Sequence, residues 1–288
     1  MSGPTEPGKV EAMDFWLPVI IVFTGNFLLF FYCHIKKDNS FIDVMWGFSF
    51  VTPVIGLFIK KFLSDGPNPD TRSWIVLVLV AIWASRLSLH IGWRHVKEDF
   101  RYAEMRRDWT EKGGYWGYVL RAFFIIFMMQ AAFSLVTNSC ALYVHIYSNS
   151  ENLIWLDFVG IAVWLFGFLF EWIGDEQLKR HLADKSPDKP KFIKWGLWRY
   201  TRHPNYFGEC VLWWGIYFLA CSVKFGFATI YAPVFINLLI RFLSGVPMLE
   251  EKYLNNPEFK QYMRETNVFF PWFVTKTAEG KNSDEEVL

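Results

Sequence analysis

The feature that most constrains this chain is a series of long apolar segments, each close to the length of a bilayer-spanning helix. A hydrocarbon core about 30 Å thick is crossed by about 20 predominantly apolar helical residues. The segments that meet this requirement to within a few residues are Asp14–Tyr32, Phe41–Phe62, Ser73–Trp93, Tyr118–Tyr147, Leu153–Gly174, Pro204–Cys221 and Phe225–Gly245. The sequence therefore predicts an all-α protein, a polytopic transmembrane helical bundle of about seven spans.

Composition agrees with a lipid environment and excludes several other classes of protein. The 288 residues are 53% hydrophobic, 20% aromatic and only 20% charged, which argues against a soluble globular protein. A net charge of +1 leaves no broad basic surface for phosphates, so no nucleic-acid partner is expected. The four cysteines show no CxxC spacing, so neither a disulfide framework nor a thiolate zinc site is indicated.

Lysine and arginine are distributed unequally among the connections between the predicted spans. The connections after the first, third and fifth spans, residues 33–40, 94–117 and 175–203, hold 2, 6 and 8 of these basic residues. Those after the second, fourth and sixth spans hold only 2 between them, beyond Lys60 and Lys61 at a span border. Because cytosolic connections carry the basic excess, the amino end is predicted to be luminal or outside and the carboxyl end cytosolic.

The predicted organisation is one membrane domain with short polar ends. Residues 1–13 are expected to be luminal, residues 14–274 to form the transmembrane domain, and residues 275–288 to form a polar cytosolic tail. The first span lacks the flanks of a cleaved signal peptide, so it is expected to be a retained anchor. The endoplasmic reticulum or another endomembrane is the expected location. The fourth span, with 30 residues, could tilt, bend at Thr137–Ser139 or extend beyond the bilayer.

Several ionisable residues lie inside predicted spans, where a charge near the bilayer centre costs at least about 2.5–3.5 kcal/mol. Asp43 lies in the second span, and Arg86 and His90 share one face of the third. Each therefore needs a partner, a cavity or a role. Asp157, in contrast, is interpreted as a helix-end residue at headgroup depth that snorkels or is paired with another charge.

Two pairs of polar residues, each four positions apart, stand at the expected cytosolic ends of the fifth and sixth spans. Glu171 and Asp175 share a face at the end of the fifth, and Asn205 and Glu209 begin the sixth. Two carboxylates on one face repel each other unless a ligand or basic side chains supply donors. We therefore interpret Glu171 and Asp175 as a hydrogen-bonding site for a sugar or an amide.

The segment Gly196–Glu209, which reads GLWRYTRHPNYFGE, carries the most chemical information. Pro204 suits the first turn of a helix, and Arg199 and Arg202 place two guanidinium groups near that helix start, where backbone N–H groups favour anions. This arrangement indicates a cradle for an anionic cofactor. The alternative is a basic cytosolic loop in which proline and glycine only shape the helix start and His203 has no ligand.

With these residues in place, the chain resembles the polytopic steroid 5-alpha-reductase-like membrane proteins, in the branch that carries the Gly196–Glu209 string. The likeness extends over most of the chain. Further matching residues are Phe41–Gly47, Ser85–Leu87, Arg101–Tyr102, Glu171, Asp175–Leu178, Trp213–Gly215, Ser244–Gly245, Pro247 and Tyr262–Pro271. The resemblance implies a reductase-like helical bundle that holds NADPH on its cytosolic side. It would reduce a carbon–carbon double bond conjugated to a carbonyl in a lipid-like or steroid-like substrate.

The resemblance also implies roles for individual residues. The glutamate and aspartate of the fifth span would meet the nicotinamide–ribose region, and the arginine–histidine pair of the string would lie near the phosphates. The implied cofactor-binding residues are Glu171, Asp175, Arg202, His203, Asn205, Tyr206, Glu209 and Tyr262, and the predicted anion cradle adds Arg199.

Two positions depart from the pattern of the characterised steroid reductases. Those enzymes polarise the substrate carbonyl with a Glu and a Tyr from early helices, and Asp43, Arg86 and Tyr102 are the plausible catalytic substitutes here. The arginine that the family places seven positions after its Asp is Leu182 in this chain, and Lys179 or Arg180 would have to replace it.

Two other functions remain open from the sequence. Isoprenylcysteine carboxyl methyltransferases have a related architecture and an Arg-His-Pro-x-Tyr-x-Gly turn, but they bind S-adenosylmethionine. NADPH needs several cationic groups for its phosphates, whereas a sulfonium zwitterion prefers carboxylates or aromatic rings. The third hypothesis is a membrane scaffold or transporter that keeps the fold without turnover.

Overall fold

A computed structural model describes residues 10–64 and 68–275, and within these ranges every regular element is a helix. Among these described residues, six helical stretches are long and apolar enough to cross a membrane: Ala12–Lys36, Phe41–Leu63, Thr71–Arg94, Phe100–Tyr147, Trp155–Ala183 and Gly226–Tyr253. The predicted all-α polytopic fold is confirmed, and the chain is an integral membrane protein. The predicted sixth span, Pro204–Cys221, also forms a helix with those bounds. The count of seven spans and their orientation stay predictions.

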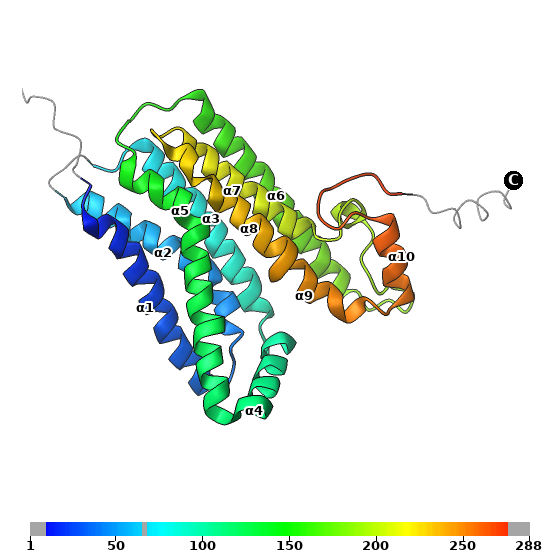
Figure 1. The fold of residues 1–288 in the computed structure, drawn as a ribbon. Coiled ribbons are helices and arrows are strands. Elements are labelled where there is room, and N and C mark those ends of the chain that lie inside the picture. The colour runs from blue at the N-terminus through cyan, green and yellow to red at the C-terminus, as the bar shows by residue number, and fades with distance from the viewer. Residues whose placement is uncertain (1–9, 65–67, 276–288) are drawn as a thin grey trace, which may run out of the picture. The chain divides into compact units, whose positions relative to one another are not determined.

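The helices follow one another in the chain with short connections (Figure 1). In order they are α1 (Ala12–Lys36), α2 (Phe41–Leu63), α3 (Thr71–Arg94), α4 (Phe100–Arg121), the π-helix η1 (Ala122–Met128), α5 (Met129–Tyr147), α6 (Trp155–Ala183), the 3₁₀-helix η2 (Gly196–Arg199), α7 (Pro204–Cys221), the 3₁₀-helix η3 (Gly226–Ile230), α8 (Tyr231–Leu238), the π-helix η4 (Leu239–Leu243), α9 (Val246–Glu250), the 3₁₀-helix η5 (Glu251–Tyr253) and α10 (Pro257–Glu265).

The chain divides into two compact units. Unit 1 comprises Met1–Phe158 and Ile216–Ala232, and unit 2 comprises Val159–Gly215 and Pro233–Leu288. In unit 1, α2 packs against α1, α3 and α5, and these helices lie side by side in Figure 1. Unit 2 contains most of α6 and α7, with α9 and α10. The predicted polar tail from residue 276 onward lies outside the described residues.

The fourth predicted span is part of a longer helical stretch, and its tilt, bend or extension beyond the bilayer stays a prediction. Residues Phe100–Tyr147 form α4, η1 and α5 in succession. The irregular point lies at Gly114, where φ is 64° and ψ is −170°, a conformation that glycine adopts without a side-chain clash. Residues Thr137–Ser139 lie within α5, where the Asn138 side-chain amide donates to the Phe50 carbonyl at 2.8 Å.

Helices α6 and α7 touch through glycines spaced seven residues apart, which keeps them on one helical face. The glycines are Gly160, Gly167 and Gly174 on α6 and Gly208 and Gly215 on α7. A Cβ atom on Gly208 would lie 2.4 Å from the Glu171 backbone nitrogen, and one on Gly167 would lie 2.4 Å from the Leu212 backbone nitrogen. The two backbones are therefore in direct contact, as in other close helix pairs of membrane proteins.

We expect Gly208→Ala to destabilise unit 2, because the added methyl group meets backbone atoms that can move only if the two helices separate. Overpacking of this kind typically costs about 1–3 kcal/mol. Thermal unfolding in detergent should show a lower midpoint than the native chain. Gly25→Ala on α1 is the matched control, because a Cβ there meets nothing within 4 Å; equal midpoints for the two variants would contradict the contact.

Candidate functional site

Polar residues of unit 2 meet where α7 begins beside α6. The Asn205 side-chain nitrogen donates to Asp175 Oδ1 at 3.1 Å, and Asp175 is buried. Trp198 Nε1 donates to the Gly174 carbonyl at 3.0 Å, which holds the loop before α7 against α6. Among the described residues, Asn205 Oδ1 is buried without a hydrogen-bond partner. The pair therefore presents buried acceptor oxygens, which suits a ligand with hydroxyl or amide donors.

Two further carboxylates are buried along the same helix pair. Glu171 is 2% exposed and lies one turn before Asp175 on α6, with its backbone against Gly208. Glu209 follows that glycine on α7 and is also buried. The structure therefore brings these predicted residues to one end of the α6–α7 pair.

A buried ion cluster lies just before α7, built from Arg202, His203 and Glu250. Arg202 binds both carboxylate oxygens of Glu250, through Nε at 2.8 Å and Nη2 at 3.1 Å. The Nη1 atom donates to the carbonyl of Thr266 at 2.6 Å. His203 Nε2 lies 2.9 Å from Glu250 Oε1. The cluster thus ties the loop before α7 to α9 and to the chain after α10.

The electrostatics of this cluster follow from its burial. Burial lowers the pKa of His203 below its usual value, and this outweighs the neighbouring Glu250 carboxylate, which raises the pKa. A neutral His203 that bonds to a carboxylate through Nε2 carries its proton on that nitrogen. Most N–H groups of the Arg202 guanidinium donate within the protein, to the Glu250 carboxylate and to backbone carbonyls. Its predicted contact with a cofactor phosphate stays a prediction.

The other residues predicted for the cofactor lie around this cluster. The Tyr206 ring stacks on the His203 ring at a centroid distance of 5.6 Å and an interplanar angle of 14°. Tyr262, on α10, is buried, and its hydroxyl donates to the Trp198 carbonyl at 2.5 Å. Burial raises the pKa of Tyr262, so the phenol stays protonated. Arg199 is exposed, and its carbonyl accepts from the Thr266 hydroxyl at 3.3 Å.

The predicted catalytic residues lie in unit 1, where two of them are hydrogen-bonded. The Tyr102 hydroxyl donates to Asp43 Oδ1 at 2.6 Å, and Arg101 Nη2 donates to the other carboxylate oxygen at 2.8 Å. Gln130 Nε2 lies 3.5 Å from the Tyr102 hydroxyl oxygen. Tyr102 is 5% exposed. Arg86 lies on α3, the helix that packs on α2.

Glu250 is the residue of the cluster that the sequence did not reveal. It stands beyond the last predicted span, next to Glu251 and Lys252, so it looks like one charge of a solvated connection. The signal that could have indicated such an acid is the Arg202–His203 pair in the loop before α7, because a buried guanidinium needs a carboxylate partner. The sequence alone does not tell which of several acids provides it.

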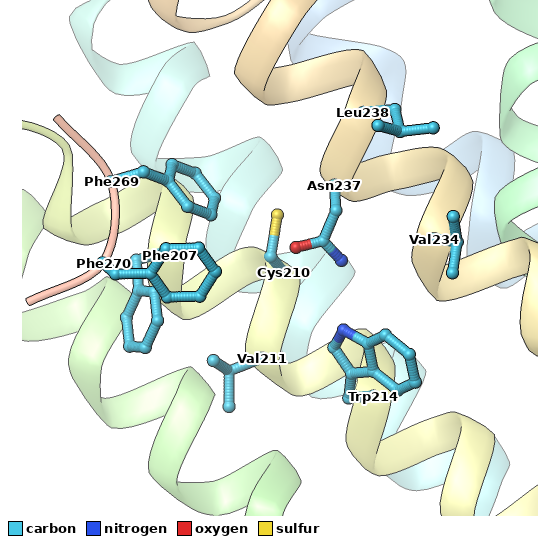
Figure 2. A pocket seen from close by; sticks show the side chains of 9 residues that line it. All are labelled: Phe207, Cys210, Val211, Trp214, Val234, Asn237, Leu238, Phe269 and Phe270. Atoms are coloured by element: carbon cyan, nitrogen blue, oxygen red, sulfur yellow. The ribbon is translucent and has the colours of Figure 1, made fainter.

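An apolar groove of about 350 Å³ lies beside α7 in unit 2. Figure 2 shows the Asn237 amide and the Cys210 sulfur at the centre of its lining, with Phe207, Phe269 and Phe270 grouped on one side. The remaining lining residues are Val211, Trp214, Val234 and Leu238. The lining is almost entirely apolar, which suits an apolar ligand with at most one or two polar groups.

Comparisons with known proteins cover most of the chain. The profile of a family described as "Protein of unknown function (DUF1295)" matches residues 29–266. An uncharacterised protein of Schizosaccharomyces pombe is 23% identical in an alignment 297 positions long, gaps included, which covers 92% of this chain and 83% of that protein. Methanethiol S-methyltransferase 1 of Bradyrhizobium diazoefficiens is 22% identical over 260 residues, which cover 86% of this chain and 83% of that enzyme. No solved structure gives a significant match.

Proposed function

Since the chain belongs to the family of proteins of unknown function DUF1295, we propose a function from its own side chains. The proposal is a membrane-embedded, NADPH-dependent oxidoreductase that reduces a carbon–carbon double bond conjugated to a carbonyl in an apolar, lipid-like substrate. The observation that carries it is the hydrogen bond of Tyr102 to Asp43, an acid and a phenol on early helices. The endoplasmic reticulum or another endomembrane is the proposed location.

The chemistry of such a reduction explains why a pair of this kind is needed. When hydride adds to the β carbon of an enone, negative charge develops on the carbonyl oxygen, and a fixed donor must stabilise that charge until a proton reaches the α carbon and completes the reduction. Tyr102 would supply this donor when its buried hydroxyl, which donates to Asp43 in this structure, turns to the substrate oxygen. Arg101 keeps Asp43 paired when the phenol turns to a substrate oxygen. NADPH, when bound, would supply the hydride.

The acceptor oxygens of unit 2 fit the neutral parts of this cofactor. Asp175 and Asn205 would accept hydrogen bonds from ribose hydroxyls or from the nicotinamide amide, because Asn205 Oδ1 has no partner among the described residues. The exposed guanidinium of Arg199 would be open to a phosphate. The apolar groove beside α7 supports a substrate that partitions from the bilayer.

We expect Tyr102→Phe to lower the turnover rate by about 10²–10³, the usual effect of removing one donor to a developing oxyanion. Cofactor affinity should stay unchanged. The rate of NADPH oxidation with a panel of apolar enones measures the turnover rate, and ligand-induced thermal stabilisation measures the cofactor affinity. Tyr118→Phe is the control, because it removes another buried phenol of α4, one that bonds to Asn39. Equal rates for the two variants would contradict the assigned role.

A second candidate function is methyl transfer from S-adenosylmethionine, and two observations favour it. One relative is named a methanethiol S-methyltransferase. In addition, the described part of unit 2 buries more carboxylates than guanidinium groups. Within the described residues of unit 2, the buried charged residues other than histidine are Glu171, Asp175, Glu209, Glu250 and Arg202. These carboxylates would attract the cationic sulfonium of S-adenosylmethionine and repel a multiply charged anion such as NADPH.

Thermal unfolding of the purified chain with each cofactor separates these functions. A ligand that binds only the folded state raises the unfolding temperature, so NADPH should do so under the first proposal and S-adenosylmethionine under the second. A chain that responds to neither ligand would support the scaffold.

Asp175→Asn should weaken the binding of whichever ligand stabilises the chain by about 10- to 100-fold, because a hydrogen bond to a charged group contributes about 1.5–3 kcal/mol. Glu176→Gln, at an exposed ion pair with Arg180, is the matched control.

A further inference from the structure

The segment that follows α10 exposes three large aromatic side chains within four residues. Phe270 is 69% exposed, Trp272 is 67% exposed and Phe273 is 77% exposed. Contiguous exposed apolar surface of this kind marks an interaction site on a folded protein. We refer to residues 270–273 as the aromatic segment.

Hydrogen bonds within and beside the aromatic segment fix it to the rest of unit 2, so its exposure is not that of a loose end. The Phe269 carbonyl accepts from the Thr201 hydroxyl at 2.8 Å, and the Trp272 N–H donates to the Tyr200 carbonyl at 3.0 Å. Just after it, the Thr275 N–H donates to the Glu265 carbonyl at 3.0 Å. The segment is therefore held beside the loop that precedes α7.

Ring contacts connect the aromatic segment to the apolar part of unit 2. The rings of Phe269 and Phe270 each lie 6.1 Å from the ring of Phe207, in the first turn of α7. Both also line the groove with Val234 and Leu238, which are exposed residues of a candidate membrane span (Figure 2). The aromatic segment thus continues the exposed apolar surface of this candidate span at the end where α7 begins.

The charged face of α10 gives the other boundary. Helix α10 exposes Lys260, Gln261 and Arg264, while Phe259 and Tyr262 are buried against the loop before α7. Polar side chains of this kind stay in water, whereas Trp and Phe are favoured at the headgroup level of a bilayer. The extramembrane part of unit 2 therefore has a polar side on α10 and an apolar side on the aromatic segment.

We propose that the aromatic segment inserts into the headgroup region of the bilayer and seats the extramembrane part of unit 2 on the membrane surface. The partner is the lipid interface itself, and Trp272 and Phe273 are the inserted side chains. Interfacial apolar side chains reach about 5–10 Å into the boundary between headgroups and acyl chains. The inference does not depend on which cofactor the protein binds.

Depth-dependent quenching on the full chain in phosphatidylcholine vesicles tests the proposal. Trp272→Cys and Phe273→Cys would each be labelled with an environment-sensitive thiol dye, and Gln261→Cys on α10 is the matched exposed control. The natural cysteines are expected to react little, since Cys33, Cys140 and Cys210 are buried and Cys221 is partly buried, and the native chain treated with the dye gives their background. Lipids with a nitroxide near the headgroup should quench the labels at 272 and 273 at least about twofold more than the label at 261.

Each possible quenching result supports or contradicts the proposed insertion. Strong nitroxide quenching at 272 and 273 with weak quenching by aqueous iodide supports the insertion. Strong iodide quenching at all three positions would place the segment in water and overturn it. Protection of 272 and 273 from both quenchers would show that protein covers them, which would overturn it as well. Because the substituted residues are exposed, the variants are expected to fold, and unchanged thermal midpoints check this.

Discussion

Replacing Asp157 with asparagine should destabilise unit 1 by about 3–5 kcal/mol, the usual cost of removing one partner of a buried ion pair. Arg72 donates to both oxygens of Asp157, through Nε at 2.7 Å and Nη2 at 2.8 Å. The two side chains are only 3% and 0% exposed. The variant would leave the guanidinium buried without its charge partner. A large fall in the thermal midpoint, measured in detergent or vesicles, is the expected result.

The surroundings of this pair explain why no other group can take the place of Asp157. Arg72 Nη1 donates to the Ser148 hydroxyl at 3.0 Å, and that hydroxyl donates to Asp70 at 2.8 Å. Asp70 is already neutralised by Lys61, whose ammonium lies 2.8 Å from it. Although burial alone would raise the pKa of Asp70, these donors hold it below its ordinary value. Every charge of the network therefore has its own partner.

Two variants serve as controls for this prediction. Glu151→Gln alters an exposed carboxylate that accepts from Thr71, so it should change stability by less than about 1 kcal/mol. The double variant Arg72→Met with Asp157→Leu removes both charges and should recover much of the loss, because a buried ion pair contributes little over apolar packing. If Asp157→Asn behaved like Glu151→Gln, the pair would contribute no more than a surface contact.

The membrane-spanning pattern could be predicted from the sequence because it depends on local composition. Stretches of apolar residues must be helical in lipid, where backbone groups have no water to bond. The predicted segments Phe41–Phe62 and Pro204–Cys221 accordingly match helices to within one residue at each end. The four-residue spacing of Glu171 and Asp175 also correctly predicted that they lie together on one helix, α6.

The partners of buried charges could not be predicted, because they come from distant parts of the chain. Asp157 was interpreted as a helix-end residue at headgroup depth, and it does lie in the first turn of α6, but its partner was not foreseen: it is fully buried against Arg72, 85 positions away. Glu250 likewise pairs with Arg202 across 48 positions. Hydropathy places a helix end near the membrane surface, but tertiary packing decides whether a side chain there faces water or protein.

Glu250→Gln should destabilise unit 2 by about 3–5 kcal/mol, because it leaves the Arg202 guanidinium buried beside a neutral amide. The side chains of Arg202 and Glu250 are 7% and 11% exposed, so water offers little compensation. The loss should appear as a lower thermal midpoint without added ligand, which separates it from any effect on cofactor binding. It should also raise proteolysis of the segment after α10, since Arg202 donates to the Thr266 carbonyl there.

The neighbouring residue provides the matched control, because Glu251 is an exposed carboxylate one position along the same helical turn. Glu251→Gln should leave the midpoint and the proteolysis pattern unchanged within about 0.5 kcal/mol. A combined Arg202→Met and Glu250→Leu variant removes both charges and should be more stable than Glu250→Gln alone. Should Glu250→Gln and Glu251→Gln unfold at the same temperature, the cluster would be a loose surface contact. The loop before α7 would then need another anchor to hold Asn205 at Asp175.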